Sequence, residues 1–280
     1  MRHSLIYLPD PYPKLMTATI LKKTALTLAL AALSAWQPLF AQEKAKSEAE
    51  TEQAAPPANI HRIWAVTPKP DAGEAFMEAL LAHMQWRLDH QDPWEWQVYV
   101  AGSGEVDGTV FLRSDGQTHA AMDAYSESEF SEAAGKHWEE NVHPMVADYS
   151  THLSRSDLAL SDWPDEEYRI YTVTRFHLKP GHGAAFRASL IGIDAKLKEA
   201  GRTVPHGWNW AMTGDHLPTI SLVQARKDWK GFDLPEESVT DILTEAYGPA
   251  QAISMLDSLY SHVERISSDI YFRIRDFSAE

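Results

Sequence analysis

The sequence contains no cysteine. That absence excludes disulfide bonds, thiolate metal ligands, a cysteine nucleophile and covalently attached c-type haem. Basic residues are also scarce, since 25 Lys and Arg stand against 40 Asp and Glu and the net charge is -15. Nucleic-acid backbones and anionic membrane surfaces attract clustered Lys and Arg. We therefore expect no nucleic acid among the partners of this protein.

Recognisable catalytic motifs are missing as well. The sequence holds no G-x-S-x-G nucleophile elbow, no P-loop and no G-x-G-x-x-G fingerprint. Its 13 histidines suggest a metal site, but no H-E-x-x-H zinc motif is present. Glu139 and His143 share a helix face at i, i+4, and His83 and His90 stand two turns apart. We predict solvated helix faces here and no metal site.

A secretory signal peptide is indicated at residues 1–41. Lys22-Lys23 precedes an apolar run rich in Ala and Leu, and Ala41 offers a small residue for cleavage. The apolar stretch is shorter than the ~20 residues of a membrane span, so we expect cleavage and not anchoring. Met16 is an alternative start to Met1. These features predict a bacterial protein of the periplasm or the medium, without stable membrane insertion after cleavage.

One stretch of the remaining chain occurs twice. Lys69–Leu80 reads KPDAGEAFMEAL, and Lys179–Leu190 reads KPGHGAAFRASL, at an offset of 110 residues. A period of this length is that of a whole domain and is too long for a solenoid repeat. We predict a tandem duplication with repeats at 60–165 and 166–280. Residues 42–59 have no apolar periodicity and are expected to be a disordered linker.

Each repeat is predicted to follow the β-α-β-β-α-β order of a ferredoxin-like unit. The first repeat has expected strands at 60–66, 94–100, 109–113 and 158–160, a helix capped by Asp71 and running to Leu88, and helices within 117–155. The second has expected strands at 168–178, 207–213, 219–225 and 270–274, a helix ending at Gly201, and a helical region before the last strand. The later helices rest on apolar stripes that include Tyr149, Leu153 and Val263.

This pattern resembles the dimeric α+β barrel superfamily, which includes EthD-like, antibiotic-biosynthesis-monooxygenase-like and NIPSNAP-like proteins. The resemblance covers 60–276, with a Trp-bearing second strand in each unit. It is carried by Lys69, Pro70, Gly73 and Phe76 and by Lys179, Pro180, Gly181, Gly183 and Phe186. It implies an α+β fold in which two tandem ferredoxin-like units form an intramolecular pseudo-dimeric barrel, with ligand pockets between sheet and helices. Members include oxygenases, haem proteins, isomerases and proteins without known activity, so the resemblance implies no single function.

A polar row is expected in the second repeat. Tyr171, Arg175 and His177 alternate on one strand, and Asn209 is expected on a neighbouring one. Beside large aromatic residues, such a row can orient the carbonyl or phenol group of a substrate. The catalytic candidates are therefore His177, Arg175 and Asn209. The alternative is a satisfied polar interface inside the barrel. The matching positions of the first repeat are His61, Ala65 and Thr67, so a single pocket is expected in the second repeat.

Aromatic residues recur on the second strands, where Trp94, Trp96, Trp208 and Trp210 alternate with other residues. Core packing is the default interpretation of such residues, and an aromatic wall for a flat ligand is the alternative. The candidates for ligand binding are Trp96, Tyr171, His206 and Trp208. Haem requires an axial histidine in an apolar pocket, for which the candidates are His177, His206 and His137. Without a distinguishing haem motif, we predict no cofactor.

Three functions remain open at this point. The first is binding of a small apolar or aromatic molecule, by a monomeric pseudo-dimer or a higher homo-oligomer. The second is a cofactor-independent monooxygenase or isomerase acting on an aromatic compound, and replacement of His177 by Ala would separate it from binding alone. The third is an interaction or structural protein of the cell envelope, which a solid core without a pocket would favour.

Overall fold

The structure is a computed structural model. It describes residues 57–163, 166–199, 201, 205–233 and 237–277. The expected leader 1–41 and the linker up to residue 56 lie outside the described residues. Residues 55–280 form one compact unit. In the described part of the chain, no helix is both long and apolar enough to cross a membrane.

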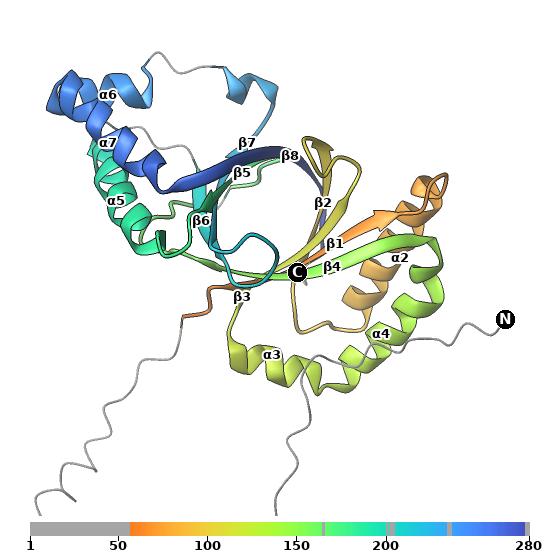
Figure 1. The fold of residues 1–280 in the computed structure, drawn as a ribbon. Coiled ribbons are helices and arrows are strands. Elements are labelled where there is room, and N and C mark those ends of the chain that lie inside the picture. The colour runs from red at the N-terminus through yellow and green to blue at the C-terminus, as the bar shows by residue number, and fades with distance from the viewer. Residues whose placement is uncertain (1–56, 164–165, 200, 202–204, 234–236, 278–280) are drawn as a thin grey trace, which may run out of the picture. The chain divides into compact units, whose positions relative to one another are not determined.

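Eight antiparallel strands close into one barrel, seen almost along its axis in Figure 1. They are β1 (Ile60–Pro68), β2 (Trp96–Ser103), β3 (Val110–Gln117), β4 (Val146–Ser156), β5 (Ile170–Leu178), β6 (His206–Ala211), β7 (Thr219–Arg226) and β8 (Val263–Phe277). Their order around the barrel is β1-β3-β2-β8-β5-β7-β6-β4. Each repeat thus contributes four neighbouring strands in the same internal order.

Two seams join the repeats. At one seam β2 pairs with β8, and at the other β4 pairs with β6, where Ser156 lies opposite Asn209. A free ferredoxin-like sheet would expose these edges, and barrel closure removes them. The structure therefore confirms an intramolecular pseudo-dimeric α+β barrel built from two ferredoxin-like units.

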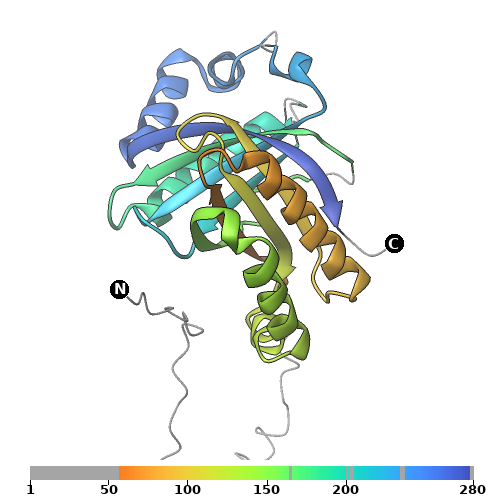
Figure 2. The same cartoon turned by 90° about the vertical axis from the view of Figure 1, so that its right-hand side faces the viewer.

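Helices cover the outside of the barrel in two groups (Figures 1 and 2). The first group is α2 (Gly73–Asp89), α3 (His119–Ser126) and α4 (Glu129–Asn141), followed by the short helix η1 (His143–Met145). The second group is α5 (Gly183–Glu199), η2 (Trp229–Phe232), α6 (Val239–Tyr247) and α7 (Pro249–Ser261). The apolar stripes predicted for α2 and α5 are confirmed, because Phe76 and Leu80 of α2 and Phe186 and Leu190 of α5 are all buried. The stripe predicted on α7 is confirmed only in part, because Ile253 and Tyr260 are exposed.

Strand alternation divides the side chains between two environments. On β1, Ile60 and Val66 point outward into the core beneath α2, whereas Ile63 and Ala65 point into the barrel. A matching core beneath α5 and α7 contains Phe176 of β5. The apolar cores therefore lie between the sheet and the helices. The inner face of the barrel is not part of these cores, and other residues line it.

The predicted position of the last strand in the first repeat was wrong. Residues 146–156 form β4, not a helix, and Leu158–Leu160 lies outside any strand. Tyr149 and Leu153 are four positions apart, a spacing that places two side chains on one face of a helix and also on one face of a strand. The same ambiguity explains why Val263, assigned to a helical stripe, begins β8.

The predicted cap of α2 was also wrong. Ala72 is the N-cap residue and makes no side-chain capping bond. Asp71 instead adopts a left-handed backbone conformation with φ 66° in the turn after β1. Asp is among the few residues that tolerate this conformation, so Asp71 belongs to the turn and does not cap the helix.

Candidate functional site

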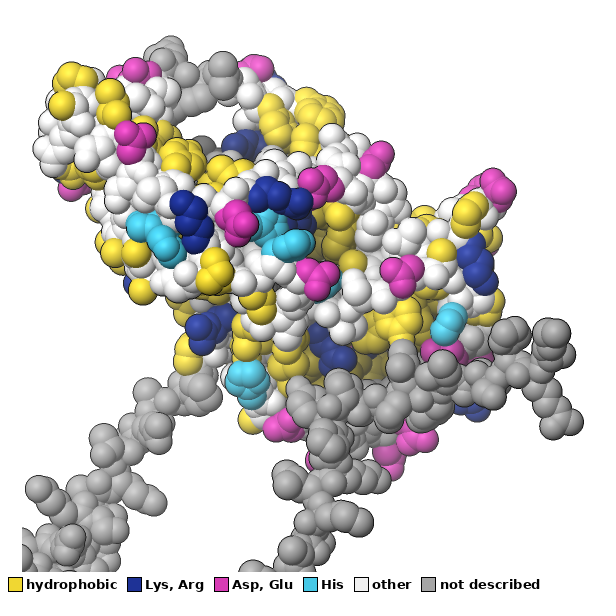
Figure 3. Space-filling model, in the orientation of Figure 1, with side chains coloured by type: hydrophobic (Ala, Val, Ile, Leu, Met, Phe, Trp, Pro, Cys, Tyr) yellow, Lys and Arg dark blue, Asp and Glu magenta, His cyan; other side chains and the backbone are white. Residues whose placement is uncertain are grey.

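The inner faces of the eight strands surround a cavity of about 700 Å³, which we call the lumen. Both repeats line it, so the expectation of a pocket in the second repeat alone does not describe the structure. The pocket implied between sheet and helices is likewise not the main one, because apolar side chains fill that space. Figure 3 shows histidine, basic and acidic side chains together on the face that carries one end of the barrel.

One side of the lumen is aromatic. Tyr99 of β2 and Tyr171 of β5 meet edge to face with ring centroids 5.2 Å apart. Phe111 of β3 and Tyr271 of β8 form a second such pair at 5.1 Å. Burial raises the pKa of the Tyr99 phenol, opposed by the positive charge of Arg113. These rings give the lumen a wall suited to flat apolar groups.

Beside the aromatic wall lies a buried ion pair between Arg175 of β5 and Asp269 of β8. Arg175 also donates to the hydroxyl of Tyr271, and Asp269 accepts from the backbone N–H of Glu105 at 2.7 Å. Burial raises the pKa of the Tyr271 phenol, while the charge of Arg175 and its hydrogen bond lower it. The Arg175 side chain is 26 % exposed and lines the lumen, where a bound ligand can contact it.

His177 lies near one end of the lumen. Its Nδ1 is 3.0 Å from the hydroxyl of Thr219, and its Nε2 is 3.5 Å from that of Ser267. Desolvation, together with the charge of Arg265, lowers the pKa of His177. The imidazole is therefore mostly neutral at pH 7 and able to accept a proton.

A second polar row crosses four neighbouring strands. His61 of β1 places Nδ1 2.6 Å from a carboxylate oxygen of Asp115 on β3. Its Nε2 lies 2.6 Å from the hydroxyl of Ser156 on β4. That hydroxyl is in turn 2.9 Å from the amide oxygen of Asn209 on β6. The row therefore crosses the seam between the repeats.

Electrostatics hold this row in a defined charge state. Desolvation lowers the pKa of His61, as does the charge of Arg113, and both outweigh the opposite effect of Asp115. For Asp115, desolvation alone would raise the pKa, but Arg113 and His61 hold it well below its usual range. At neutral pH the row is thus a carboxylate beside a neutral imidazole.

Four of the predicted site residues meet in the lumen, namely Tyr171, Arg175, His177 and Asn209. Arg175 and Asn209 flank Ser221, which pairs with each of them from β7. Two strand spacings separate them by roughly 10 Å. Asn209 consequently contacts Ser156 and not Arg175.

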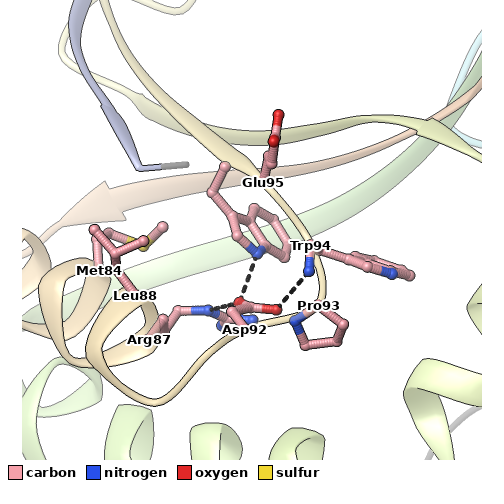
Figure 4. Close-up of a pocket in the computed structure, with 8 residues that line it drawn as sticks. Met84, Arg87, Leu88, Asp92, Pro93, Trp94 and Glu95 are labelled. Carbon is pink, nitrogen blue, oxygen red and sulfur yellow. Dashed lines mark hydrogen bonds and ion pairs between the residues drawn. The ribbon is translucent and has the colours of Figure 1, made fainter. Parts of the chain in front are cut away.

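The other predicted ligand-binding residues lie on the outer side of the sheet. The indole of Trp96 packs in the core beneath α2 and donates to Asp92 at 2.9 Å, beside the bonds that Asp92 accepts from Arg87 and Trp94 (Figure 4). Trp208 is buried in the core beneath α5. His206 lies 3.0 Å from the carbonyl oxygen of Leu160. None of these three lines the lumen.

Sequence reasoning missed His61, Asp115 and Ser156 as a group. Alternation alone would have placed His61 on the inner face of its strand, as it did for Tyr171. Ser156 was missed because residues 146–155, which precede it on β4, were predicted to be helical. Asp115 lies beyond the predicted end of its strand. Only the pairing of β1 with both β3 and β4 brings the three together.

None of the three candidate histidines lies in the apolar surroundings expected of a haem ligand. Both ring nitrogens of His177 face hydroxyl groups, His206 faces a carbonyl oxygen, and His137 contacts His83 at 2.9 Å. We therefore derive no chemistry through haem. Among the described residues, no group of three or more His, Asp or Glu side chains is arranged to hold a metal ion. Glu139 and His143 form a 2.7 Å surface pair.

Comparison with solved structures supports the fold. A "putative monooxygenase" from Lactobacillus acidophilus NCFM has a TM-score of 0.50 and 8% identity, over 78% of this chain and 95% of that one. Another, from Fusobacterium nucleatum subsp. nucleatum, has a TM-score of 0.50 and 10% identity, over 78% and 94%. An anthrone oxidase-like protein has a TM-score of 0.49 and 12% identity, over 79% and 94%. No protein-family model and no curated protein matches the sequence.

At such identities the likeness shows the fold and nothing finer. The chain has the fold of the dimeric α+β barrel proteins, and here a single chain supplies both halves of the barrel.

Proposed function

We propose that this protein binds a small organic molecule with an aromatic or apolar body inside the lumen. The lumen itself carries this proposal, because its volume of about 700 Å³ lies within the roughly 300–1,000 Å³ typical of ligand sites. A purely structural envelope protein is expected to have a solid core without a pocket, and the lumen differs from such a core.

The wall of the lumen favours a ligand with two unlike ends. Tyr99, Phe111 and Tyr171 supply ring faces and edges for a flat apolar group. Arg175 and His177 supply a cation and a neutral imidazole for a hydroxyl, carbonyl or carboxylate. A phenol, naphthol or aromatic acid has both features, whereas a pure hydrocarbon would make no polar contact with Arg175 or His177.

Blocking the lumen tests this proposal. Ala65 faces the lumen from β1, so Ala65→Trp should fill part of it, whereas Thr151→Trp on the exposed outer face of β4 should not. We expect Ala65→Trp to weaken the binding of 2-naphthol or 2-naphthoate at least ~10-fold, a loss of ~1.4 kcal/mol of binding free energy. Calorimetry measures both affinities. Equal affinity in two folded variants would contradict lumen binding, as would a wild-type protein that binds neither compound.

A cofactor-independent monooxygenase or isomerase is the second candidate. The observation in its favour is Arg175 beside the aromatic wall, because a fixed cation stabilises a substrate phenolate or enolate. The names of the two structural neighbours point the same way. His177→Ala should then abolish oxygen consumption or isomerisation while retaining part of the binding, and His119→Ala on an exposed helix start is the control. Intact turnover in His177→Ala would remove the catalytic assignment.

We also propose export through the leader 1–41, followed by function in the periplasm or medium as a monomeric pseudo-dimer or a higher homo-oligomer. The three-part leader pattern supports export, and internal barrel closure supports the single-chain barrel. Sequencing the N-terminus of protein recovered from the periplasm should give Gln42, and native mass spectrometry should give the assembly state. An intact leader on the recovered protein would contradict cleavage.

A further inference from the structure

The row of Asp115, His61 and Ser156 has the connectivity of a nucleophilic triad. A carboxylate contacts one ring nitrogen of a histidine, and a serine hydroxyl contacts the other, each at 2.6 Å. Such a constellation is recognised by geometry and not by its order in the chain. Here the three residues come from three adjacent strands and not from the nucleophile elbow that the sequence lacks.

We propose that Ser156, His61 and Asp115 hydrolyse a small carboxylic ester in the lumen. This inference deepens the proposed function, on which it rests, because the ester would occupy the same cavity as the ligand. Ser156 is partly exposed and lines the lumen. Since it also lines a groove on the outer surface with Asn59 and Arg187, it stands where the lumen reaches the exterior.

The triad requires one tautomer of His61. The proton of the neutral imidazole must lie on Nδ1, toward the ionised Asp115, and the ring must turn slightly to donate it, because Nδ1 makes no hydrogen bond of acceptable angle in the described structure despite the 2.6 Å approach. Nε2 is then an acceptor, and it faces the hydroxyl of Ser156. This is the arrangement in which a histidine removes a proton from serine. Arg113 forms an ion pair with the same carboxylate and holds it in place.

The reaction balances without a cofactor or a redox partner. Oγ of Ser156 attacks the ester carbonyl carbon while its proton moves to Nε2 of His61. The tetrahedral intermediate expels the alcohol, which takes that proton, and an acyl group remains on Ser156. Water then attacks the acyl carbon, gives one proton to His61, and releases the carboxylic acid as that proton returns to Oγ.

Asn209 is placed to act on the oxyanion of this intermediate. Its amide oxygen competes with His61 for the one proton of Ser156, at 2.9 Å against 2.6 Å. A half-turn of the amide presents its N–H₂ group, the donor that an oxyanion requires.

The row is not a by-product of the duplication. The sheet register places Tyr171, Ala225 and Arg273 at the corresponding positions of the second repeat. None of these three residues is a serine, a histidine or a carboxylate. The triad therefore belongs to the first repeat only.

A biotinylated fluorophosphonate, which reacts with activated serine hydroxyls, tests the proposal on the full chain. We expect one adduct per chain, located on Ser156 by peptide mass spectrometry. Ser156→Ala should slow labelling at least ~100-fold, the minimum expected from loss of base-assisted attack. Ser154→Ala is the matched control, because Ser154 lies on the same strand and face, and its buried Oγ has no hydrogen-bond partner within the described structure.

His61→Gln should slow labelling and the hydrolysis of 4-nitrophenyl acetate similarly, with folding checked by circular dichroism. Because the pKa of His61 is lowered, wild-type labelling should persist below pH 6.5. Failure of wild-type protein to label faster than Ser156→Ala, or an adduct elsewhere, would overturn the triad. Binding of 2-naphthol without labelling of Ser156 would support the proposed ligand binding and reject the triad. Labelling of Ser156 without binding of 2-naphthol would support the triad and reject the proposed ligand binding.

Discussion

Arg175 on β5 and Asp269 on β8 form an ion pair inside the barrel, although 94 positions separate them in the sequence. Asp269 is 1 % exposed, so the cost of desolvating its charge is large unless the pair is kept. The pair links β5 to β8 diagonally across their ladder and lines the lumen. Its loss has consequences that can be measured.

Arg175→Met is expected to destabilise the fold by roughly 3 kcal/mol, because it leaves a buried carboxylate without its counter-charge. Urea unfolding followed by fluorescence measures the change. The matched control is Arg265→Met, which breaks an exposed pair with Glu105 and should cost less than ~1 kcal/mol. Equal losses in the two variants would mean that the buried pair contributes no more than a surface one.

Gly104→Ala should destabilise the protein more than Gly108→Ala. Both glycines have positive φ, so each substitution strains the backbone by about 1–2 kcal/mol. At Gly104 alone, the new Cβ would also lie 2.0 Å from a carboxylate oxygen of Asp269, whereas nothing lies within 4 Å at Gly108. Thermal unfolding of the two variants gives the comparison, and similar melting temperatures would show that the Asp269 side chain can move aside.

Acid should destabilise the fold through His83. Burial, with the charges of Arg87 and His137, lowers the pKa of His83 to about 3 from 6.5. Between these values the unfolded chain binds a proton that the folded chain does not, so stability falls as the pH drops from 6.5 toward 3. The contribution is at most ~1.4 kcal/mol per pH unit. Urea unfolding at several pH values should show a shallower dependence in His83→Gln, with exposed His90→Gln as control.

Separated halves should not remain folded monomers. Fragments 60–165 and 166–280 would expose the edges that β2, β4, β6 and β8 pair in the barrel. We expect each fragment to dimerise or to be insoluble, and sedimentation or light scattering distinguishes these states. A folded monomeric half would show that the seams are not required for stability.

The duplicated stretches determine much of the fold at the level of sequence. Phe76 and Phe186 occupy equivalent helix positions, and Trp96 and Trp208 lie on outward faces of their strands. These features follow local rules, since a helix stripe and a strand alternation can each be read within a few residues. The fourth strand of the first repeat was not predicted, and that of the second was predicted only over residues 270–274 of β8, because their outer residues have a spacing common to both structures.

The site was only partly within reach of the sequence. Arg175 and His177 could be placed on one strand face, because alternation is local. That Asn209 would contact Ser156, and that His61 would lie between Ser156 and Asp115, could not be predicted, because these contacts depend on which strands become neighbours.

The sequence alone thus determined the two units, their apolar faces and the inward row of Tyr171, Arg175 and His177. Only the tertiary structure decided that both inner faces enclose one lumen and that a serine, a histidine and a carboxylate meet in it. The physical reason is the difference between local and non-local interactions. Side-chain direction is set by the backbone of a single strand, whereas contacts across β3, β1, β4 and β6 exist only after the barrel has closed in one register.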